Sequence, residues 1–181
     1  MKLIKNIISL LNREIPIEVL KKRGMKIGKN FSKQQGCFID PSHCFLIEIG
    51  DNVTFSIRVT LLAHDASCKD LVHYAKIGKI CIEDNVFIGA NVTVLPNVTI
   101  GKNSIIGAGS IVTKNIPANS VAVGNPAKVI SSTEEYKLKL EKQLQASKNF
   151  SEDYTMRKKV DNLKKEELKK NVEKYGICFI K

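Results

Sequence analysis

The sequence predicts an all-β solenoid, in which the chain winds into stacked coils of short parallel strands. An aliphatic residue returns at every sixth position over long stretches, a spacing typical neither of a helix nor of simple strand alternation. The sequence also has no Trp and only 6% aromatic residues against 43% hydrophobic residues, so Ile and Val must fill most of its core. Three six-residue segments would close one coil of about 18 residues, and successive coils would stack about 4.8 Å apart.

The repeat is clearest in the segment "IEDNVF-IGANVT-VLPNVT-IGKNSI-IGAGSI-VTKNIP". We expect its aliphatic positions to point into the solenoid; they are Ile82, Ile88, Val94, Ile100, Ile106 and Val112. The same spacing runs earlier through Ile49, Phe55 and Leu61, and a weaker version begins at Ile27. The "GAG" of residues 107–109 and the "NVT" triplets fall inside this frame. We therefore interpret them as parts of the repeat, and not as a dinucleotide loop or glycosylation sites.

Three segments follow from the pattern: a helical segment over residues 1–26, the β-helix over 27–130 and a charged helical extension over 131–181. The first segment places apolar residues on one helical face before Pro16, at Leu3, Ile4, Ile7, Ile8 and Leu11. That helix is too short to cross a bilayer, and we favour packing against the main domain over contact with a membrane surface. The extension predicts helices from Glu134 and from Val160, which we expect to pack on the solenoid or on a neighbouring subunit.

The bulk properties narrow the class of protein. The formal net charge is +11, with most of the excess before residue 49 and after residue 130. We ascribe it mainly to solvated faces, with an anionic partner as the alternative. The aromatic interleaving of a nucleic-acid binder is missing. The five cysteines form no C-x-x-C pair and follow no secretory leader, which favours a cytoplasmic protein without a disulfide framework or zinc knuckle.

The repeat stops at one place, just after "LLAHDA". Continued regularly, it would put aliphatic residues at positions now held by Ser67, His73 and Lys79. It resumes at Ile82, 21 positions after Leu61 where a coil would take 18, which predicts a small inserted loop from about Ser67 to Lys76. Interruptions of a solenoid are common at binding sites. His64 lies immediately before this loop and outside the inward aliphatic positions.

These hexapeptides, with "IGAGSIVTKNIP" and "GNPAKVI", resemble the hexapeptide-repeat acyltransferases over about residues 27–130. The resemblance is to the maltose and galactoside acetyltransferase-like branch, and especially to O-acetyltransferases of capsule and polysaccharide synthesis. It implies a left-handed parallel β-helix, a homotrimer with active sites between subunits, acetyl-CoA as co-substrate and no metal.

His64 is the candidate general base. A hydroxyl that attacks a thioester must lose a proton, and an imidazole can accept one near neutral pH. In the resembled branch the base is a histidine just before such a loop, a position that His64 matches. Asp65 is a weaker catalytic candidate that could orient His64 or only cap the turn. His43 and His73 are candidates to line the acceptor pocket.

The resemblance also assigns residues to acetyl-CoA. Ala90 and Ala108 match positions that contact the cofactor in the family, and Thr113 and Lys114 match a contact near its nucleotide end, where a cation suits phosphate. Lys128 stands where the family often has Arg. For both lysines, a solvated edge of the solenoid is the alternative.

The acceptor is less defined. The positions that hold the sugar in galactoside enzymes fall at about Gly36 and Cys44 here, so we expect a nucleotide sugar, a lipid-linked intermediate or a glycan in place of a simple galactoside or maltose. The alternatives are N-acetylation of an amino-sugar nucleotide or small amine, serine O-acetylation, a zinc carbonic anhydrase on the same solenoid, and a non-enzymatic scaffold for anionic partners. The three histidines do not match the spacing of that anhydrase family.

Overall fold

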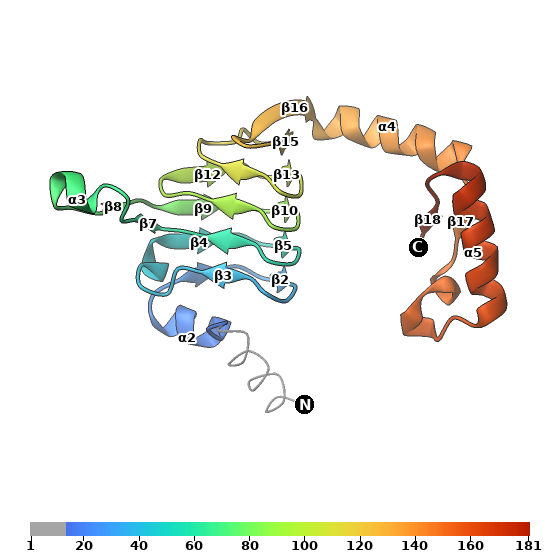
Figure 1. The fold of residues 1–181 in the computed structure, drawn as a ribbon, viewed down its shortest axis with the longest axis horizontal. Helices are drawn as coiled ribbons and strands as arrows, with labels where there is room; N and C mark the ends of the chain where they lie inside the picture. The colour runs from blue at the N-terminus through green and yellow to red at the C-terminus, as the bar shows by residue number, and fades with distance from the viewer. Residues whose placement is uncertain (1–13) are drawn as a thin grey trace. The chain divides into compact units, whose positions relative to one another are not determined.

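A parallel solenoid forms the first part of the chain in the computed structural model, which describes residues 14–181 (Figure 1). Its walls are three sheets, named here A, B and C, and the chain visits them in turn. Sheet A contains β1 (Lys26–Ile27), β4 (Ile47–Ile49), β9 (Ile80–Ile82) and β12 (Val98–Ile100). Sheet B begins with β2 (Ser32–Lys33), β5 (Thr54–Phe55), β10 (Phe87–Ile88) and β13 (Ile105–Ile106). Sheet C contains β3 (Phe38–Ile39), β6 (Thr60–Leu61), β11 (Thr93–Val94) and β14 (Ile111–Val112).

The aliphatic positions of the repeat fill the interior, which confirms the predicted parallel solenoid. Ile82, Ile88, Val94, Ile100, Ile106 and Val112 are each at most 1% exposed, and the register pairs each with its equivalent one coil away. Each fully buried side chain of this kind stabilises the fold by about 1.5–3 kcal/mol. Phe55 is a large aromatic residue in this interior; it is fully buried and meets the ring of Phe31 edge-on.

Asparagines stack along the turn between sheets A and B. Their side-chain amides form a ladder with N···O distances of 2.9 to 3.1 Å, through Asn30, Asn52, Asn85, Asn103 and Asn119. Each has a φ of 55° to 58°, the left-handed conformation that Asn tolerates better than most residues. The triplet residues Asn91 and Asn97 adopt positive φ too, so these asparagines are turn residues of the repeat.

Two insertions interrupt the coils, and both follow strands of sheet C. The first follows β3 and contains a 3-10 turn, η1 (Cys44–Leu46), so that the first coil takes 22 residues. The second follows β6. Ile49 pairs with Ile82, so this coil takes 33 residues where the regular coil takes 18.

The second insertion is therefore larger than the sequence predicted. Leu61 ends its coil, so the next regular position was due only six residues later. The inserted residues form an arm in which β7 (His64–Asp65) pairs antiparallel with β8 (Lys76–Ile77), with a short helix, α3 (Lys69–Val72), at its tip (Figure 1). The tip agrees with the loop expected over Ser67 to Lys76.

The two ends of the solenoid are closed differently. At one end α2 (Ile17–Lys22) buries Leu20 against the first coil. At the other end β15 (Ser120–Val123) continues sheet B, and β16 (Lys128–Ser132) pairs antiparallel with it. The predicted amphipathic helix around Leu3 to Leu11 lies outside the described residues.

The chain divides into two compact units after Thr133. The second unit contains α4 (Thr133–Ala146) from its second residue onward and α5 (Asn162–Tyr175), which confirms the two predicted helices. It also contains β17 (Asn149–Phe150), which pairs with β18 (Phe179–Ile180), and the 3-10 turns η2 (Glu152–Tyr154) and η3 (Met156–Lys158). Neither α4 nor α5 has a buried residue, so their expected packing partner stays a prediction, as does the division at residues 26 and 130. Over residues 14–181, every helix is too short or too polar to cross a bilayer.

Candidate active site

His64 lies where the chain leaves sheet C and enters the arm. Its neighbour Ala63 is fully buried, and Leu62 still donates its N–H to Val94 of the next coil. The side chain of His64 is 37% exposed. The imidazole is therefore neither sealed inside the solenoid nor free in solvent, which is what a base that must reach a substrate requires.

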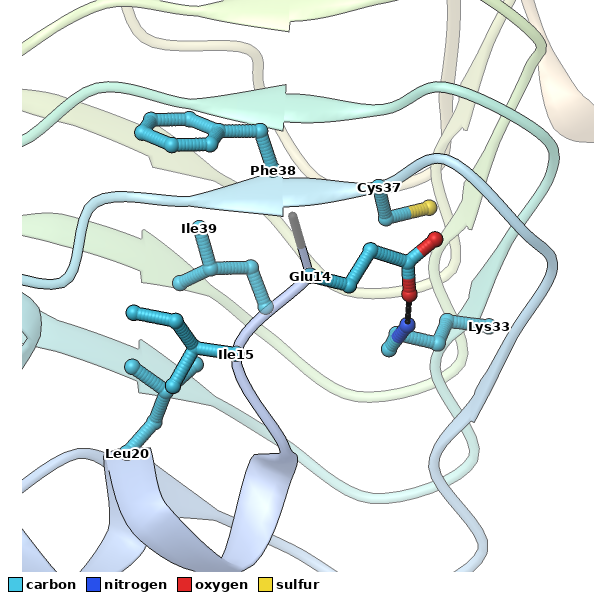
Figure 2. A pocket seen from close by; sticks show the side chains of 7 residues that line it. All are labelled: Glu14, Ile15, Leu20, Lys33, Cys37, Phe38 and Ile39. Carbon is cyan, nitrogen blue, oxygen red and sulfur yellow. Dashed lines mark hydrogen bonds and ion pairs between the residues drawn. The ribbon is translucent and has the colours of Figure 1, made fainter. Parts of the chain in front are cut away.

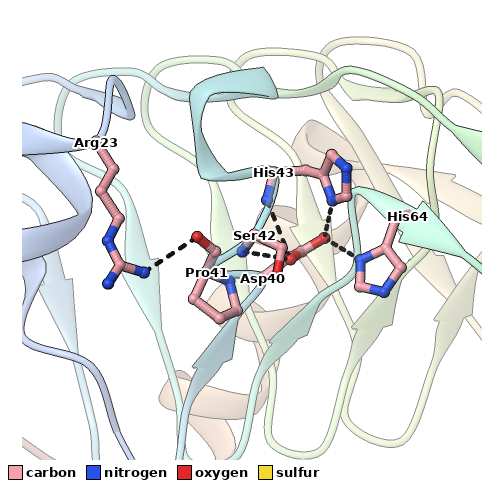
Figure 3. A network of polar contacts seen from close by, with 6 residues as sticks. All are labelled: Arg23, Asp40, Pro41, Ser42, His43 and His64. Carbon is pink, nitrogen blue, oxygen red and sulfur yellow. Dashed lines mark hydrogen bonds and ion pairs between the residues drawn. The ribbon is translucent and has the colours of Figure 1, made fainter.

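Asp40 holds this imidazole. Because Ile39 pairs with Leu61, the residues that follow β3 lie beside those that follow β6. The Asp40 side chain is fully buried, and its Oδ2 lies 2.5 Å from Nδ1 of His64 (Figure 3). Its Oδ1 accepts the backbone N–H groups of Ser42 at 3.0 Å and His43 at 3.2 Å.

These contacts keep the carboxyl group of Asp40 charged. Burial by itself raises its pKa, but the hydrogen bond with His64 and those from the N–H groups of Ser42 and His43 outweigh burial, and the pKa falls below the ordinary value. An anionic Asp40 can only accept hydrogen bonds. It therefore fixes the proton of a neutral His64 on Nδ1 and leaves Nε2 as the basic nitrogen.

His43 lies beside this pair. Its ring centroid is 5.0 Å from that of His64, and its Nδ1 is 3.7 Å from Oδ2 of Asp40, too far for a hydrogen bond. Nδ1 is buried and has no hydrogen-bond partner within residues 14–181. Arg23 donates to the carbonyl of Pro41 in the same turn (Figure 3). His43, which the sequence predicted to line the acceptor pocket, thus lies at the candidate site.

Asp65 requires a correction, because its carboxylate is directed into the arm. Oδ2 pairs with Lys76 at 2.8 Å across the β7–β8 pairing, and Oδ1 accepts the N–H of Ser67 at 2.9 Å. The hydrogen bond from Lys76, followed by those from Ser67, holds the pKa of Asp65 well below its usual range. The carboxylate that contacts His64 is therefore that of Asp40, and the carboxylate of Asp65 caps the turn at Ser67, as its alternative interpretation expected.

His73 lies on the arm, apart from this cluster. It ends α3 with a φ of 62°, and within the described chain it makes no contact with Asp40 or His64. The arm around it is strongly exposed, with Leu71 at 81% and Tyr74 at 76%. Its expected role in acceptor binding stays a prediction.

The residues expected to contact acetyl-CoA lie along the two edges of sheet C. Ala90 and Ala108 are stacked in adjacent coils at the turn from sheet B to sheet C, where Gly109 donates its N–H to the Ala90 carbonyl at 2.8 Å. Thr113 and Lys114 are exposed at the opposite edge, after β14, two coils from the edge position of His64. Lys128 is exposed at the start of β16, next to Ala127, which donates to the carbonyl of Ile111. The outer face of sheet C thus separates the two groups.

A small hollow beside α2 is a structural feature. Figure 2 shows the side chain of Glu14 reaching Lys33, with which it forms an ion pair of 2.5 Å, below the thiol of Cys37. The N–H of Gly36 also donates to Glu14, and burial raises the pKa of Cys37. The cavity volume of about 10 Å³ leaves room for one water molecule at most, so it cannot admit a pantetheine arm.

The chain belongs to the bacterial hexapeptide-repeat transferase family. Residues 82–114 match the family described as "Bacterial transferase hexapeptide (six repeats)". The chain is 38% identical over 143 residues to Protein CapG of Staphylococcus aureus, covering 75% of this chain and 82% of that protein. It is 34% identical over 118 residues to the putative acetyltransferase YvoF of Bacillus subtilis, covering 65% of this chain and 66% of that protein. The resemblance stated from the sequence is thereby confirmed.

Solved structures share the fold. A hexapeptide-repeat acetyltransferase of Vibrio cholerae, complexed with acetyl coenzyme A, has a TM-score of 0.55 and 25% identity over 61% of each chain. A maltose O-acetyltransferase of Clostridium difficile has a TM-score of 0.53 and 29% identity, over 71% of this chain and 83% of that one. The serine acetyltransferase of Neisseria gonorrhoeae has a TM-score of 0.50 and 29% identity, but the match covers only 38% of its length and 60% of this chain.

Sequence reasoning missed Asp40, although a signal was present. "FIDPSH" carries an acidic residue directly after the inward position Ile39, and the spacing from Ile27 to Ile49 is four residues too long for one coil. Aligning Ile39 with Leu61 across that irregularity would have placed Asp40 beside His64.

Proposed function

We propose that the protein is an acetyl-CoA-dependent O-acetyltransferase that acetylates a hydroxyl of a sugar-containing acceptor. The observation that carries the proposal is the Asp40–His64 pair at the edge of a hexapeptide-repeat transferase solenoid. We further propose that the coil is left-handed, as its structural relatives imply, and that the enzyme is a homotrimer with sites between subunits.

The transfer would take place directly in a ternary complex. Nε2 of His64 accepts the proton of the hydroxyl while its oxygen attacks the thioester carbonyl carbon. Asp40, held by the N–H groups of Ser42 and His43, stabilises the imidazolium formed on His64. When the tetrahedral intermediate collapses, the C–S bond breaks, and the imidazolium returns its proton to the thiolate of coenzyme A.

The pantetheine arm would lie along sheet C. Backbone groups at Ala90 and Ala108 would bind its amides from one edge, and Thr113 and Lys114 would meet the nucleotide end from the other. Lys128 would supply a further cation for phosphate. Support comes from the exposure of Ala108, Thr113 and the two lysines, and from the structural relative that is described as complexed with acetyl coenzyme A.

A sugar-containing acceptor is supported by the likeness to the maltose O-acetyltransferase, and a glycan, capsule or nucleotide-sugar acceptor by the sequence similarity to CapG. His43 would contact this acceptor from beside Asp40, and His73 from the arm. The likeness to serine acetyltransferase favours a second candidate in the same reaction class, with serine as the acceptor hydroxyl.

The test is thiol release from acetyl-CoA over a panel of nucleotide sugars, oligosaccharides, serine and amino-sugar nucleotides. We expect turnover with one class of sugar hydroxyl, and a loss of about 100-fold or more in His64→Ala, the usual scale for a general base. Transfer to amines alone would overturn the assignment as an O-acetyltransferase. Transfer to serine alone would overturn the sugar-containing acceptor, and unchanged turnover in His64→Ala would overturn His64 as the general base. Absence of turnover with the whole panel, together with salt-sensitive binding to an anionic polymer, would favour a scaffold.

A further inference from the structure

The cluster around Asp40 contains one ring nitrogen, Nδ1 of His43, that no hydrogen bond within residues 14–181 satisfies. An oxygen of Asp40 and one ring nitrogen from each of His43 and His64 lie within 4.8 Å of one another. Asp40 and His64 are hydrogen-bonded, but Nδ1 of His43 is buried and lacks a hydrogen bond in the described part of the chain. A buried polar atom without a partner is costly, so it needs an explanation.

The three donors suit a transition-metal ion. Two imidazoles and a carboxylate are donors that Zn²⁺ binds at about 2.0–2.2 Å, which separates the ligand atoms of a tetrahedral site by about 3.3–3.5 Å. The 3.7 Å between His43 Nδ1 and Asp40 Oδ2 fits that spacing. The 2.5 Å between Asp40 and His64 must lengthen, so an ion here must displace the proton that they share. Mg²⁺ and Ca²⁺ prefer oxygen donors and are disfavoured.

We propose that Asp40, His43 and His64 form an inhibitory binding site for a divalent transition metal of the Zn²⁺ class. The side chains of His43 and His64 are 30% and 37% exposed, so the site is open to an entering ion and to a water as fourth ligand. Metal binding and catalysis would exclude each other. An ion on Nδ1 of His64 moves the remaining ring proton to Nε2, and that nitrogen then becomes a donor and cannot act as a base.

Binding is measured first, on the full chain and without reference to activity. Competition with a chromophoric chelator gives Zn²⁺ stoichiometry and affinity, and the Co²⁺ spectrum distinguishes nitrogen and oxygen ligands from thiolates, since the chain has five free cysteines. We expect one site with a Co²⁺ spectrum free of thiolate charge transfer, and a Kd at least about 10- to 100-fold weaker in His43→Ala and in Asp40→Asn. His73→Ala is the matched control and should bind as wild type does.

Zn²⁺ should also raise the melting temperature of the wild type, which tests the site without any variant. Absence of a stoichiometric site, a thiolate spectrum, or a site that persists in both His43→Ala and folded Asp40→Asn would overturn the proposal.

The claim that the metal inhibits the enzyme rests on the proposed function, and a second assay tests inhibition separately from metal binding. Acetyl transfer to the acceptor is followed by mass spectrometry, because Zn²⁺ would bind the thiol that a thiol-release assay detects. We expect Zn²⁺ to inhibit the wild type, EDTA to restore it, and His43→Ala to need at least about tenfold more Zn²⁺ for half-inhibition. Stoichiometric binding without inhibition would refute His64 as the base and the inhibitory role while leaving the metal site in place. Transfer that depends on His64 without Zn²⁺ binding would refute the site and leave the function standing.

Discussion

Replacing Asp40 by Asn tests whether the charge of this buried carboxylate is needed. The substitution is nearly isosteric and keeps an oxygen that can accept the N–H groups of Ser42 and His43, at 3.0 and 3.2 Å in the wild type. It changes the third contact, 2.5 Å from His64, where an amide N–H now faces Nδ1. That N–H makes Nδ1 the acceptor and places the ring proton on Nε2, the tautomer that cannot act as a base.

The size of the effect follows from that one contact. A hydrogen bond to a charged group is worth about 1.5–3 kcal/mol, so losing the carboxylate should destabilise the imidazolium enough to slow transfer at least about tenfold. The wrong tautomer adds to this, up to about 10⁴-fold in total. Because the two main-chain contacts survive, the loss in unfolding free energy should stay within about 1–3 kcal/mol, and the variant should fold.

The assay compares kcat for thiol release among wild type, Asp40→Asn, His64→Ala and the double variant, with thermal melts as the folding control. Asp40 and His64 act as one unit, so the double variant should be little slower than His64→Ala alone. Asp65→Asn is the matched control, since it makes the same chemical change one residue from His64. A folded Asp40→Asn with wild-type kcat, or losses in the double variant that simply multiply, would refute this account of the pair.

Three further predictions test other features. Asp65→Asn should keep a rate near that of the wild type, because its carboxylate binds Lys76 and the N–H of Ser67; a loss as large as that of Asp40→Asn would return Asp65 to the catalytic site. Ile88→Ala, at a fully buried position, should lower the unfolding free energy by about 2–5 kcal/mol in urea titrations, and a change below about 1 kcal/mol would contradict its place in the core. The lowered pKa of Asp40 should stabilise the folded state above about pH 4, where the unfolded carboxyl is charged, and this contribution should disappear as the pH falls through the folded-state value. Urea titrations should therefore show the gap in unfolding free energy between wild type and Asp40→Asn shrinking in acid, and a gap that is constant with pH would contradict the charged state of Asp40.

The fold could be predicted because the hexapeptides of the repeat obey the same constraint, the burial of one apolar side chain inside the coil. The two regular coils from Ile82 to Val112 bury an aliphatic residue on every wall, so these positions specify register as well as burial. The hand of the coil and the partners of the charged helices lack such redundancy. Nothing in a six-residue spacing distinguishes a left-handed from a right-handed coil, and helices with no buried residue leave no pattern that names their partner.

The site could be predicted only in part, because its members come from different coils. His64 was predicted from the break in the repeat together with the family resemblance, but Asp40, which contacts it, is 24 residues earlier, in a coil whose own insertion disturbs the alignment. Asp65 was the nearer carboxylate in the sequence. Alternation along β7 and the lysine on β8 turn it toward the arm, however, and that pairing follows from tertiary structure alone.

Both insertions start from the same wall of the solenoid, and this placement explains how a uniform scaffold can carry a specific site. A regular coil buries mainly apolar side chains and small neutral ones such as Ser104 and Ser110, so it has no place for a buried charge. The insertion after β3 lets the chain turn back at Ser42 and His43, and their N–H groups solvate the fully buried carboxylate of Asp40. The arm after β6 releases His64 from the strand pattern, so that its ring can lie on that carboxylate while one nitrogen faces outward. Either insertion alone would leave a buried carboxylate without its imidazole partner or an imidazole without orientation, so deleting the extra residues of one should abolish transfer as completely as losing His64, while the aliphatic coils remain folded.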